Sequence, residues 1–442
     1  MYLHYNIIRS IYLIKNCIQN DEYDQNTINK IIESINNSGC LFIKIIQWIL
    51  PRLYTTTIDE KLEYELQKFY DKCNIHDIEF TKQQFKKDFK YNINDKYEIL
   101  EVIGSGSVGQ VYKIKNIKNN KLFALKILHP NVQQEFNVFK NIFYFISKIY
   151  DLKKYLPIYD YDEFFDGLEQ QLDFTNEVNN ILEFKQLHSN DLFVVPTVIN
   201  FSKNIIIMDY LEKQSENIDE LSIIKKNNTF LKIFLYNFAC SYYGICHGDL
   251  HKGNWGLNKN KLIIYDFGYC LKINHREYLK IQNMAFDQDR LNNFKKIIET
   301  ICDINDKDKK LYTEMYEKSY LENFKETIYI NLDTLYKHFY KFLNEHKLYI
   351  SSELFNVILI SGNLEKLTTS SGNLEKLTTS SDHYSTTDKD NCYKLLEDLI
   401  DVCDSYDIFP EFKKNLIDNY KRKPDDTILH LDKYNFLKSK II

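Results

Sequence analysis

Three side chains near the middle of the sequence have the types and spacing that phosphoryl transfer requires. Residues 247–254 read His-Gly-Asp-Leu-His-Lys-Gly-Asn, so Asp249 and Asn254 lie five positions apart, and Asp266 follows twelve positions later, after a short apolar run. A carboxylate beside an attacking hydroxyl can act as general base, and amide and carboxylate oxygens hold Mg²⁺ on phosphates. The pattern therefore predicts Asp249 as general base and Asn254 and Asp266 as magnesium ligands. The alternative is that these residues only cap turns.

A glycine-rich run farther upstream could cover the phosphates of a nucleotide. Residues 104–111 fit the pattern G-x-G-x-x-G-x-V between two predicted strands. Glycine lets backbone N–H groups approach phosphate oxygens closely. Because a strand follows, the run favours a kinase-type phosphate cover over a dinucleotide-binding turn, although a flexible hairpin loop is an equal alternative on this motif alone. The expected nucleotide contacts are Ile103, Gly104, Ser105, Gly106, Ser107, Val108, Gly109, Gln110 and Val111.

A lysine follows this run at the end of an apolar stretch. Lys126 comes fifteen residues after Val111 and is preceded by Ala124 and Leu125. An unpaired ammonium group inside a strand is costly to bury, so a nucleotide phosphate or a carboxylate is expected beside it. Most strand lysines lie at a sheet edge or a surface, so Lys126 is informative only together with the other two motifs.

The elements that must position these motifs are a small sheet and several helices. Apolar residues recur at three- and four-residue steps in residues 7–14 and 42–49, which predicts helices. Residues 131–187 also have helical spacing, which is broken near Pro157, and residues 261–265 predict a short strand. Five β-rich runs predict one small sheet: residues 97–103, 111–117, 122–127, 193–198 and 205–208. Residues 118–120, which read Lys-Asn-Asn, predict a hairpin-like turn between the second and third runs.

This order of elements predicts an α+β chain with two unequal lobes. We expect a helical extension over residues 1–92, a small β-rich N-lobe over 93–210 and a helical C-lobe over 211–442. A ten-residue sequence at 361–370 recurs identically at 371–380, which is shorter than the ~20 residues of a solenoid repeat. We interpret it as a duplicated surface loop and expect residues 361–391 to be flexible.

Composition excludes several classes of protein. The 57 basic and 62 acidic residues leave a net charge of −5, and Lys and Arg form no long block, so nucleic acid is not an expected partner. Nine cysteines are scattered without a C-x-x-C pair, which is typical of a reducing compartment. The sequence contains no run of ~18 uncharged apolar residues and no clear signal or transit segment, so an intracellular protein is expected.

Taken in order, the motifs resemble those of the UbiB/AarF/ADCK-type atypical protein kinases. Residues 247–254 match the family's HGDxHxGN loop, and residues 126–132 match its strand lysine with a following proline. Residues 172–180 resemble its LDYxxEAxN helix, and residues 195–210 its edge strand and hinge. The resemblance extends from about Gly39 to at least Gly268 and implies a bilobal protein-kinase-like fold.

The resemblance also implies roles for particular residues. Glu177 would pair with Lys126, and both would act beside Asp249 as catalytic residues, while Met208 would lie against the nucleotide. ATP and Mg²⁺ would be the cofactors. The family further implies a role near lipid or quinone metabolism, and hence a lipid or membrane surface as a partner besides the nucleotide.

The helical extension resembles the family's regulatory gate but departs from it. In the family's KxGQ motif, Lys44 and Gln47 are retained, whereas Ile46 replaces the glycine. In the facing ExD motif, Gln171 replaces the carboxylate and Asp173 is retained. The phosphate loop departs as well, because the family's loop is often alanine-rich. We expect a looser inhibitory latch and more ordinary ATP binding, or, alternatively, drift without consequence.

Two other functions remain open. A small-molecule kinase of the aminoglycoside or choline type uses a similar HGD loop, and a nucleotide-dependent scaffold without turnover could keep the same residues. The chain has no A-P-E sequence after residues 266–268, and Gly248 stands where ordinary kinases have an arginine that reads a phosphorylated activation loop. Regulation by activation-loop phosphorylation is therefore not expected.

Overall fold

The computed structural model describes residues 2–20, 24–49, 60–67, 75–149, 161–187, 193–212, 245–250, 253–258, 261–272, 290–300, 304–324 and 332–348. The chain divides into two compact units. Unit 1 comprises residues 1–181 and 196–211, and unit 2 comprises residues 182–195 and 212–442. The duplicated sequence at 361–380 lies outside the described residues.

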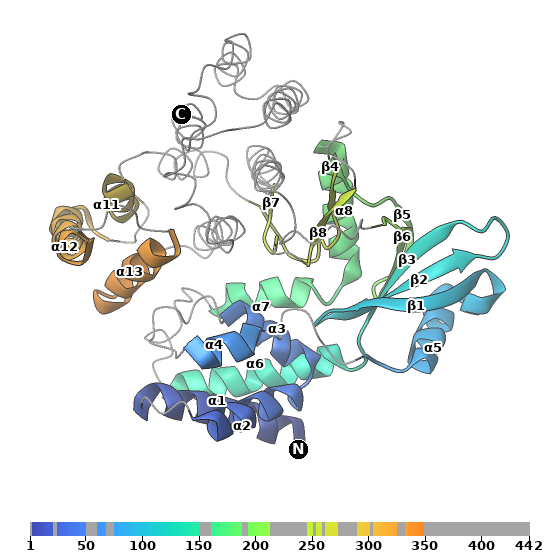
Figure 1. Ribbon diagram of the computed structural model, residues 1–442, viewed down its shortest axis with the longest axis horizontal. Helices are drawn as coiled ribbons and strands as arrows, with labels where there is room; N and C mark the ends of the chain where they lie inside the picture. Colours follow the sequence, from blue (N-terminus) through green and yellow to red (C-terminus); the bar gives the residue numbers. More distant parts are fainter. Residues whose placement is uncertain are drawn as a thin grey trace, which may run out of the picture. The chain divides into compact units, whose positions relative to one another are not determined.

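The N-terminal part of unit 1 is helical, as predicted. Its described residues form α1 (Tyr2–Asn20), α2 (Gln25–Asn36), α3 (Cys40–Ile49), α4 (Glu60–Gln67) and α5 (Ile78–Phe89). On α2, Ile28, Ile31 and Ile35 recur at three- and four-residue steps and are buried. Helix α6 (Val132–Ile149) packs against α1 and α3 (Figure 1).

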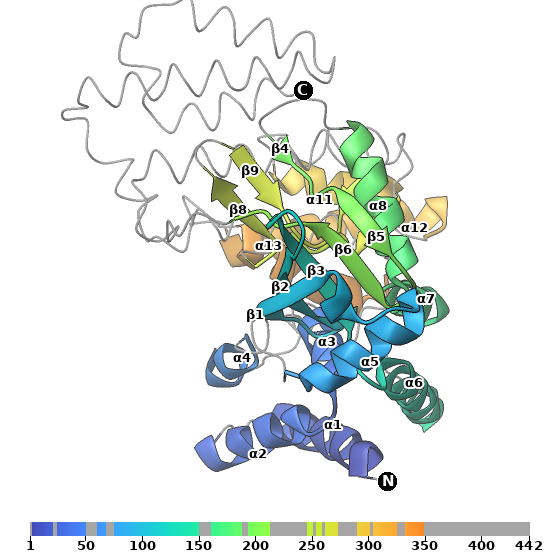
Figure 2. The same cartoon turned by 90° about the vertical axis from the view of Figure 1, so that its right-hand side faces the viewer.

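The sheet of unit 1 has five antiparallel strands in the order β1-β2-β3-β6-β5 (Figure 2). The strands are β1 (Tyr97–Ser105), β2 (Gly109–Asn116), β3 (Leu122–Leu128), β5 (Val198–Phe201) and β6 (Ile205–Asp209). The turn between β2 and β3 contains Asn120 with φ of 57°, a conformation that asparagine tolerates well. The hairpin predicted at this turn is therefore confirmed.

Apolar residues of the sheet and of α5 form one core. Phe85 of α5 packs with Tyr97, Ile114, Leu125 and Ile207, which come from β1, β2, β3 and β6. Side chains on alternate strand positions point to the same face, so one face of each of these strands contributes to the core. The core fixes the register in which β3 carries Lys126.

One predicted strand is divided in the structure. The sequence predicted a single strand over residues 193–198, but β4 (Phe193–Val194) pairs in parallel with β9 (Lys261–Ile264), whereas Val198 begins β5 in the larger sheet. Pro196 lies between the two strands and has no backbone N–H to donate to a ladder. The predicted number of five strands is right, but the fifth strand is β5, which the sequence analysis missed.

The helical spacing over residues 131–187 is confirmed in the described part of that range, which holds α6, α7 (Tyr161–Gln170) and α8 (Phe174–Leu187). The break predicted near Pro157 lies outside the described residues. Since the boundary between the two units falls after Ile181, helix α8 begins in unit 1 and ends in unit 2.

Unit 2 carries two small sheets. In the first, β7 (Ile245–His247) pairs antiparallel with β10 (Cys270–Lys272). In the second, β9 lies between β4 and β8 (Trp255–Asn258), so the strand predicted at 261–265 is confirmed. The short segments 248–254 and 265–269 connect these strands, and they contain the predicted catalytic motifs.

Three helices follow in unit 2: α11 (Arg290–Thr300), α12 (Asp306–Phe324) and α13 (Leu332–Glu345). The ring of Tyr316 on α12 is buried among Phe294, Phe339 and Phe342. Among the described helices of the chain, none combines the length and the apolar character needed to cross a membrane.

Candidate active site

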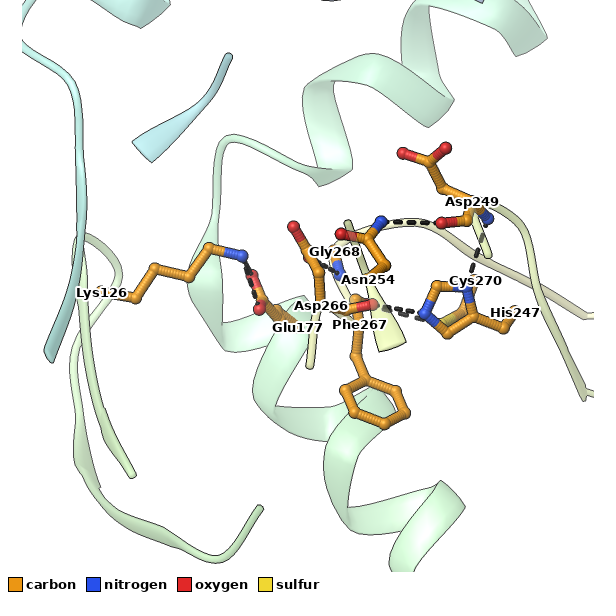
Figure 3. A network of polar contacts seen from close by, with 9 residues as sticks. All are labelled: Lys126, Glu177, His247, Asp249, Asn254, Asp266, Phe267, Gly268 and Cys270. Carbon is orange, nitrogen blue, oxygen red and sulfur yellow. Dashed lines mark hydrogen bonds and ion pairs between the residues drawn. The ribbon is translucent and has the colours of Figure 1, made fainter. Parts of the chain in front are cut away.

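Lys126 and Glu177 form a buried ion pair in unit 1. Lys126 lies on β3, between Val111 of β2 and Ile206 of β6, and is 7% exposed. Its Nζ donates to both carboxylate oxygens of Glu177, at 2.7 and 2.8 Å (Figure 3). Glu177 lies in the first turn of α8 and is 2% exposed. The carboxylate expected beside the strand lysine is therefore present, and it compensates for the burial of the charge.

The start of α8 is held in place by the sheet. The backbone N–H of Phe174 donates to the carbonyl of Lys203, in the turn between β5 and β6, at 2.9 Å. The carboxylate of Asp173 accepts a hydrogen bond from the N–H of Thr175 at 3.0 Å, as a helix N-cap does. The ring of Phe174 lies 5.3 Å from Lys126 Nζ and adds a cation–π contact.

The glycines of the phosphate loop differ in what the fold requires of them. A Cβ on Gly109 would lie 2.6 Å from the carbonyl oxygen of Ile127, so the pairing of β2 with β3 requires a glycine there. A Cβ on Gly104 would meet nothing within 4 Å, and one on Gly106 would meet only the carbonyl oxygen of Gly109, at 3.7 Å. Packing within the described part of the chain does not explain Gly104 and Gly106, which leave room for a ligand.

In unit 2, His247 joins the two predicted catalytic segments. Its ring is buried between Phe184 and Phe267, at centroid distances of 6.3 and 5.6 Å. Its Nδ1 accepts a hydrogen bond from the N–H of Asp249 at 3.2 Å, so the ring proton lies on Nε2, which donates to the carbonyl of Asp266 (Figure 3). One side chain therefore fixes the backbone at both carboxylates.

The two predicted magnesium ligands have defined donor atoms. Asn254 Nδ2 donates to the carbonyl of Asp249 at 2.7 Å, so its Oδ1 is the atom that the amide offers to a cation. The carboxylate of Asp266 accepts a hydrogen bond from the N–H of Gly268 at 2.9 Å, which fixes its orientation. These oxygens are hard ligands, and the residues present therefore fit Mg²⁺.

Gly248 is explained by the residue that faces it. A Cβ at this position would lie 2.5 Å from the ring carbon Cδ1 of Tyr269 and 3.1 Å from the carbonyl oxygen of Tyr269. The N–H of Gly248 donates to this same carbonyl at 2.9 Å. Tyr269 therefore occupies the space that a Cβ at position 248 would need.

The predicted gate residues lie in different surroundings. Lys44 and Ile46 lie on α3, where Ile46 is buried, and the side chain of Gln47 lies outside the described residues. Gln171 is buried, and its Nε2 donates to the carbonyl of Gly167 at 3.1 Å. Asp173 precedes α8 and caps its first turn, as described above. These contacts give Gln171 and Asp173 structural roles at the junction of α7 and α8, and their gating role stays a prediction.

The last two predicted nucleotide contacts lie on strands of the same sheet. Ile103 of β1 is 42% exposed, and Met208 of β6 is buried opposite Ala124 of β3. Unit 1 thus contains the glycine-rich loop, Lys126, Glu177 and Met208, whereas unit 2 contains the residues of the catalytic loop.

Three residues that support the site were not predicted from the sequence. Phe174 contacts Lys126, and His129 and His76 contact the glycine-rich loop or its neighbours. His129 stands immediately before Pro130 in the run after the strand lysine, so its position was a usable signal. No motif marked His76.

A five-stranded sheet with a lysine–glutamate pair, in a chain that also has an HGD loop and an Asp-Phe-Gly segment, defines a protein-kinase-like protein. The family model described as the ABC1 atypical kinase-like domain matches residues 68–300, more than half of the 442 residues. The chain belongs to this atypical kinase family. The resemblance to UbiB/AarF/ADCK-type kinases that the motifs indicated is therefore confirmed.

Several known proteins are similar to the chain. An ABC1 family protein, an MCP2 homologue of Schizosaccharomyces pombe, is 22% identical over 310 residues, which cover 62% of this chain and 54% of that protein. A probable serine/threonine-protein kinase, abkB of Dictyostelium discoideum, is 26% identical over 54% of this chain and 38% of its own length. A probable protein kinase UbiB of Shewanella denitrificans is 20% identical over 55% of this chain and 47% of its own length. The chain thus spans about half the length, or less, of these relatives.

One solved structure, that of Rv3197 from Mycobacterium tuberculosis in complex with erythromycin, is similar with a TM-score of 0.43 and 18% identity. The similarity covers 65% of this chain and 78% of that chain. It is too weak to bear on function.

Proposed function

We propose that the protein binds Mg²⁺–ATP and transfers or hydrolyses its γ-phosphoryl group. The observation that carries the proposal is the buried ion pair in which Lys126 Nζ reaches both oxygens of Glu177, at 2.7 and 2.8 Å. In kinases this pair places the lysine on the α- and β-phosphates. A scaffold that had lost nucleotide chemistry would have no evident reason to keep two buried charges in this arrangement.

The remaining site residues would take the roles that the matching positions have in kinases. The loop at residues 103–111 would cover the phosphates, with Met208 against the base. Asp249 would accept the proton of the attacking hydroxyl, and Asn254 and Asp266 would hold Mg²⁺, which neutralises charge on the phosphates when bound. The bonds that His247 makes to the backbone at both carboxylates support this assignment, because catalysis of phosphoryl transfer depends mainly on positioning.

Nucleotide binding and turnover can be tested separately. We expect Mg²⁺–ATP and Mg²⁺–ADP to raise the melting temperature, because a ligand present at ~100 times its Kd adds ~2.7 kcal/mol to the free energy of unfolding. Asp266→Ala should lose the magnesium-dependent part of this shift and should also lose ATP consumption. Glu322→Ala is the matched control, because it removes a carboxylate from the exposed side of α12.

The outcomes separate the remaining alternatives. No shift at millimolar nucleotide would contradict the proposal. A shift without ATP consumption, in the presence and absence of lipid vesicles and protein substrates, would favour the nucleotide-dependent scaffold. Consumption that depends on an added small-molecule alcohol would favour the aminoglycoside- or choline-type kinase.

The departures in the gate motifs lead to a second part of the proposal. We propose that Ile46 and Gln171 weaken an inhibitory contact made by the extension, and that Gly104 and Gly106 permit ordinary ATP binding. Lys44→Ala and Gln47→Ala should then change nucleotide affinity or turnover. Unchanged values in both variants would contradict a regulatory role for the extension.

A further inference from the structure

A chain of polar groups, in which His129, Thr81 and Tyr112 are buried and His76 is half-buried, connects the segment before α5 with the glycine-rich loop. His76 Nδ1 lies 2.8 Å from His129 Nδ1, and His129 Nε2 lies 2.8 Å from the carbonyl oxygen of Gly106. On the other side, His76 Nε2 lies 3.0 Å from Thr81 Oγ1, which lies 2.9 Å from the hydroxyl of Tyr112. All of these residues belong to unit 1.

The direction of each hydrogen bond in this chain is determined by its last acceptor. The carbonyl of Gly106 can only accept, so His129 must carry its proton on Nε2 and present Nδ1 as an acceptor. His76 must then donate from Nδ1 and accept at Nε2 from the hydroxyl of Thr81, which in turn accepts from Tyr112. One arrangement of protons therefore satisfies every group when both histidines are neutral.

Gln110 closes the network. Its Oε1 accepts the backbone N–H of His76 at 2.8 Å, and its Nε2 donates to the hydroxyl of Tyr112 at 2.6 Å. Gln110, Thr81 and Tyr112 are almost completely buried. A buried network in which every member is satisfied is rigid and specifies one arrangement of its residues.

His129 also determines which backbone groups of the loop are available. Its Nε2–H bonds the carbonyl of Gly106, and its backbone N–H bonds the carbonyl of Val108 at 3.0 Å. The N–H of Gly106 donates to Gly109 within the loop at 3.0 Å. Among the hydrogen bonds between described residues, the N–H groups of Ser107 and Val108 have no acceptor. Two carbonyls that would repel a phosphate are thus engaged, while two donors remain.

We propose that His129, whose Nδ1 accepts a hydrogen bond from His76, is a positioning residue that keeps the glycine-rich loop in its phosphate-binding conformation. This inference rests on the proposed function for the role of phosphate, but the anchoring of the loop does not depend on it. His76 lies 30 positions before Gly106 in the sequence, so the segment that leads from the extension into the N-lobe sets the affinity for nucleotide through this pair.

The surroundings keep both histidines neutral near pH 7. Burial and the nearby His129 lower the pKa of His76 to about 4, although Asp77 opposes this shift. Burial also lowers the pKa of His129. The arrangement of protons that satisfies the network with both histidines neutral is therefore the one expected near pH 7.

Two substitutions with side chains of similar size distinguish the effect of the hydrogen bond between His129 and the loop from the effect of packing alone. His129→Gln keeps an N–H donor near the position of Nε2, whereas His129→Met fills a similar volume without one. In nucleotide-free protein, we expect amide hydrogen exchange of residues 104–110 to become at least tenfold faster in His129→Met and to stay close to wild type in His129→Gln. Equal exchange in wild type and His129→Met would overturn the proposal.

The nucleotide measurement uses the same pair of variants. His129→Met should weaken Mg²⁺–ATP binding about tenfold, the change expected when one buried hydrogen bond is lost, and should raise KM far more than it lowers kcat. His129→Gln should recover most of this loss. If wild type binds no nucleotide, the proposed function fails, while the exchange result still decides whether the loop is anchored.

A control for general destabilisation comes from the core of the same sheet. Phe85→Leu removes core volume on α5 and leaves the histidine pair intact. When Phe85→Leu and His129→Met have the same melting temperature, we expect the amide hydrogen exchange of residues 104–110 and the KM of Phe85→Leu to remain at wild-type values. Equal changes in Phe85→Leu and His129→Met would assign His129 to packing alone and overturn the positioning role.

Discussion

Lys126 and Glu177 illustrate how one contact between side chains can serve both burial and chemistry. A buried ion pair contributes little net stability, because the cost of removing two charges from water offsets their attraction. Removing one partner is different, because the other charge stays buried without compensation. The pair therefore allows the structural cost of each substitution to be separated from its effect on ATP consumption.

We expect Glu177→Gln to lower the free energy of unfolding by ~3 kcal/mol or more, because Lys126 would remain buried and charged. Lys126→Met should cost less than half as much, since an apolar side chain replaces the cation and Glu177 can bind a proton. Both variants should lose ATP consumption. Urea unfolding and a turnover assay measure the two effects, and equal losses of stability in the two variants would contradict this account.

The three loop glycines give a second prediction for single residues. Gly109→Ala should lower the free energy of unfolding by ~1–3 kcal/mol, because its Cβ would lie 2.6 Å from the carbonyl oxygen of Ile127. Gly106→Ala should stay within ~0.5 kcal/mol of wild type, because nothing crowds the position, and should nevertheless change the affinity for Mg²⁺–ATP. Thermal melts and nucleotide titrations check both. A destabilised Gly106→Ala without altered affinity would show that this glycine serves the fold.

At the scale of single residues, most of the candidate site could be predicted from residue types and their spacing. Lys126, Asp249, Asn254 and Asp266 are recognisable because phosphoryl transfer requires those residue types at those spacings. The contact between His76 and His129 joins residues 53 positions apart, and nothing in its spacing reports a bond. Supporting residues of this kind depend on which segments the fold brings together, so they became visible only in the structure.

At the scale of elements, the start of α3 depends on an acid from another helix. Glu135 lies in the first turn of α6, and its carboxylate accepts the N–H of Leu41 at 3.1 Å. Gly39, just before α3, has φ of +89°, and a Cβ there would lie 2.5 Å from the carboxyl carbon of Glu135. The backbone conformation therefore favours glycine, and a larger residue would also displace the carboxylate of Glu135 from its place at the start of α3.

This cap leads to a prediction about pH. Burial raises the pKa of Glu135 above its ordinary value, although the hydrogen bond from Leu41 opposes the shift. An acid whose pKa is raised by folding contributes stability below its unfolded pKa, and this contribution is lost as pH rises through the folded pKa. Glu135→Gln lacks this dependence. As pH rises from 4.5 to 7, the melting temperature of Glu135→Gln should therefore increase by a few degrees relative to that of wild type. This change corresponds to a difference in the free energy of unfolding on the order of 1 kcal/mol. A constant difference across this range would contradict the prediction.

The elements themselves were predictable to different degrees. The strands β1, β2, β3 and β6 follow directly from β-rich runs separated by turn residues, and the turn at Asn120 has the expected chemistry. The division of residues 193–198 into β4 and β5 was not predicted, because a continuous apolar run does not reveal which strand each part will pair with. Pro196 was the available signal, since a proline inside a run argues against one uninterrupted strand.

At the scale of the whole molecule, the chain passes between its two units three times. It does so after Ile181, after Val195 and after Leu211. The segment 182–195 belongs to unit 2, and within it β4 pairs with β9, which lies more than 60 positions later in the sequence. The units are thus compact in space but are not continuous stretches of sequence.

We expect this interleaving to be visible in hydrogen exchange. Phe193 of β4 is buried, and Phe193→Ala should destabilise its surroundings by ~3 kcal/mol. Exchange should rise in β9, residues 261–264, and remain near wild type in β5, although β5 lies only a few positions from the substitution. Faster exchange in β5 with no change in β9 would contradict the assignment of β4 to unit 2.

The contact between Gly248 and Tyr269 also constrains the evolutionary paths open to the protein. An arginine at 248, the residue that would let a phosphorylated segment control the site, would require residue 269 to shift, because a Cβ there would lie 2.5 Å from the Tyr269 ring and 3.1 Å from its carbonyl oxygen. A smaller residue at 269 would relieve only the contacts with the ring, because the 3.1 Å contact is made by the backbone carbonyl oxygen. Gaining such an arginine would therefore have to be accompanied by a change in the backbone at Tyr269 as well as in its side chain.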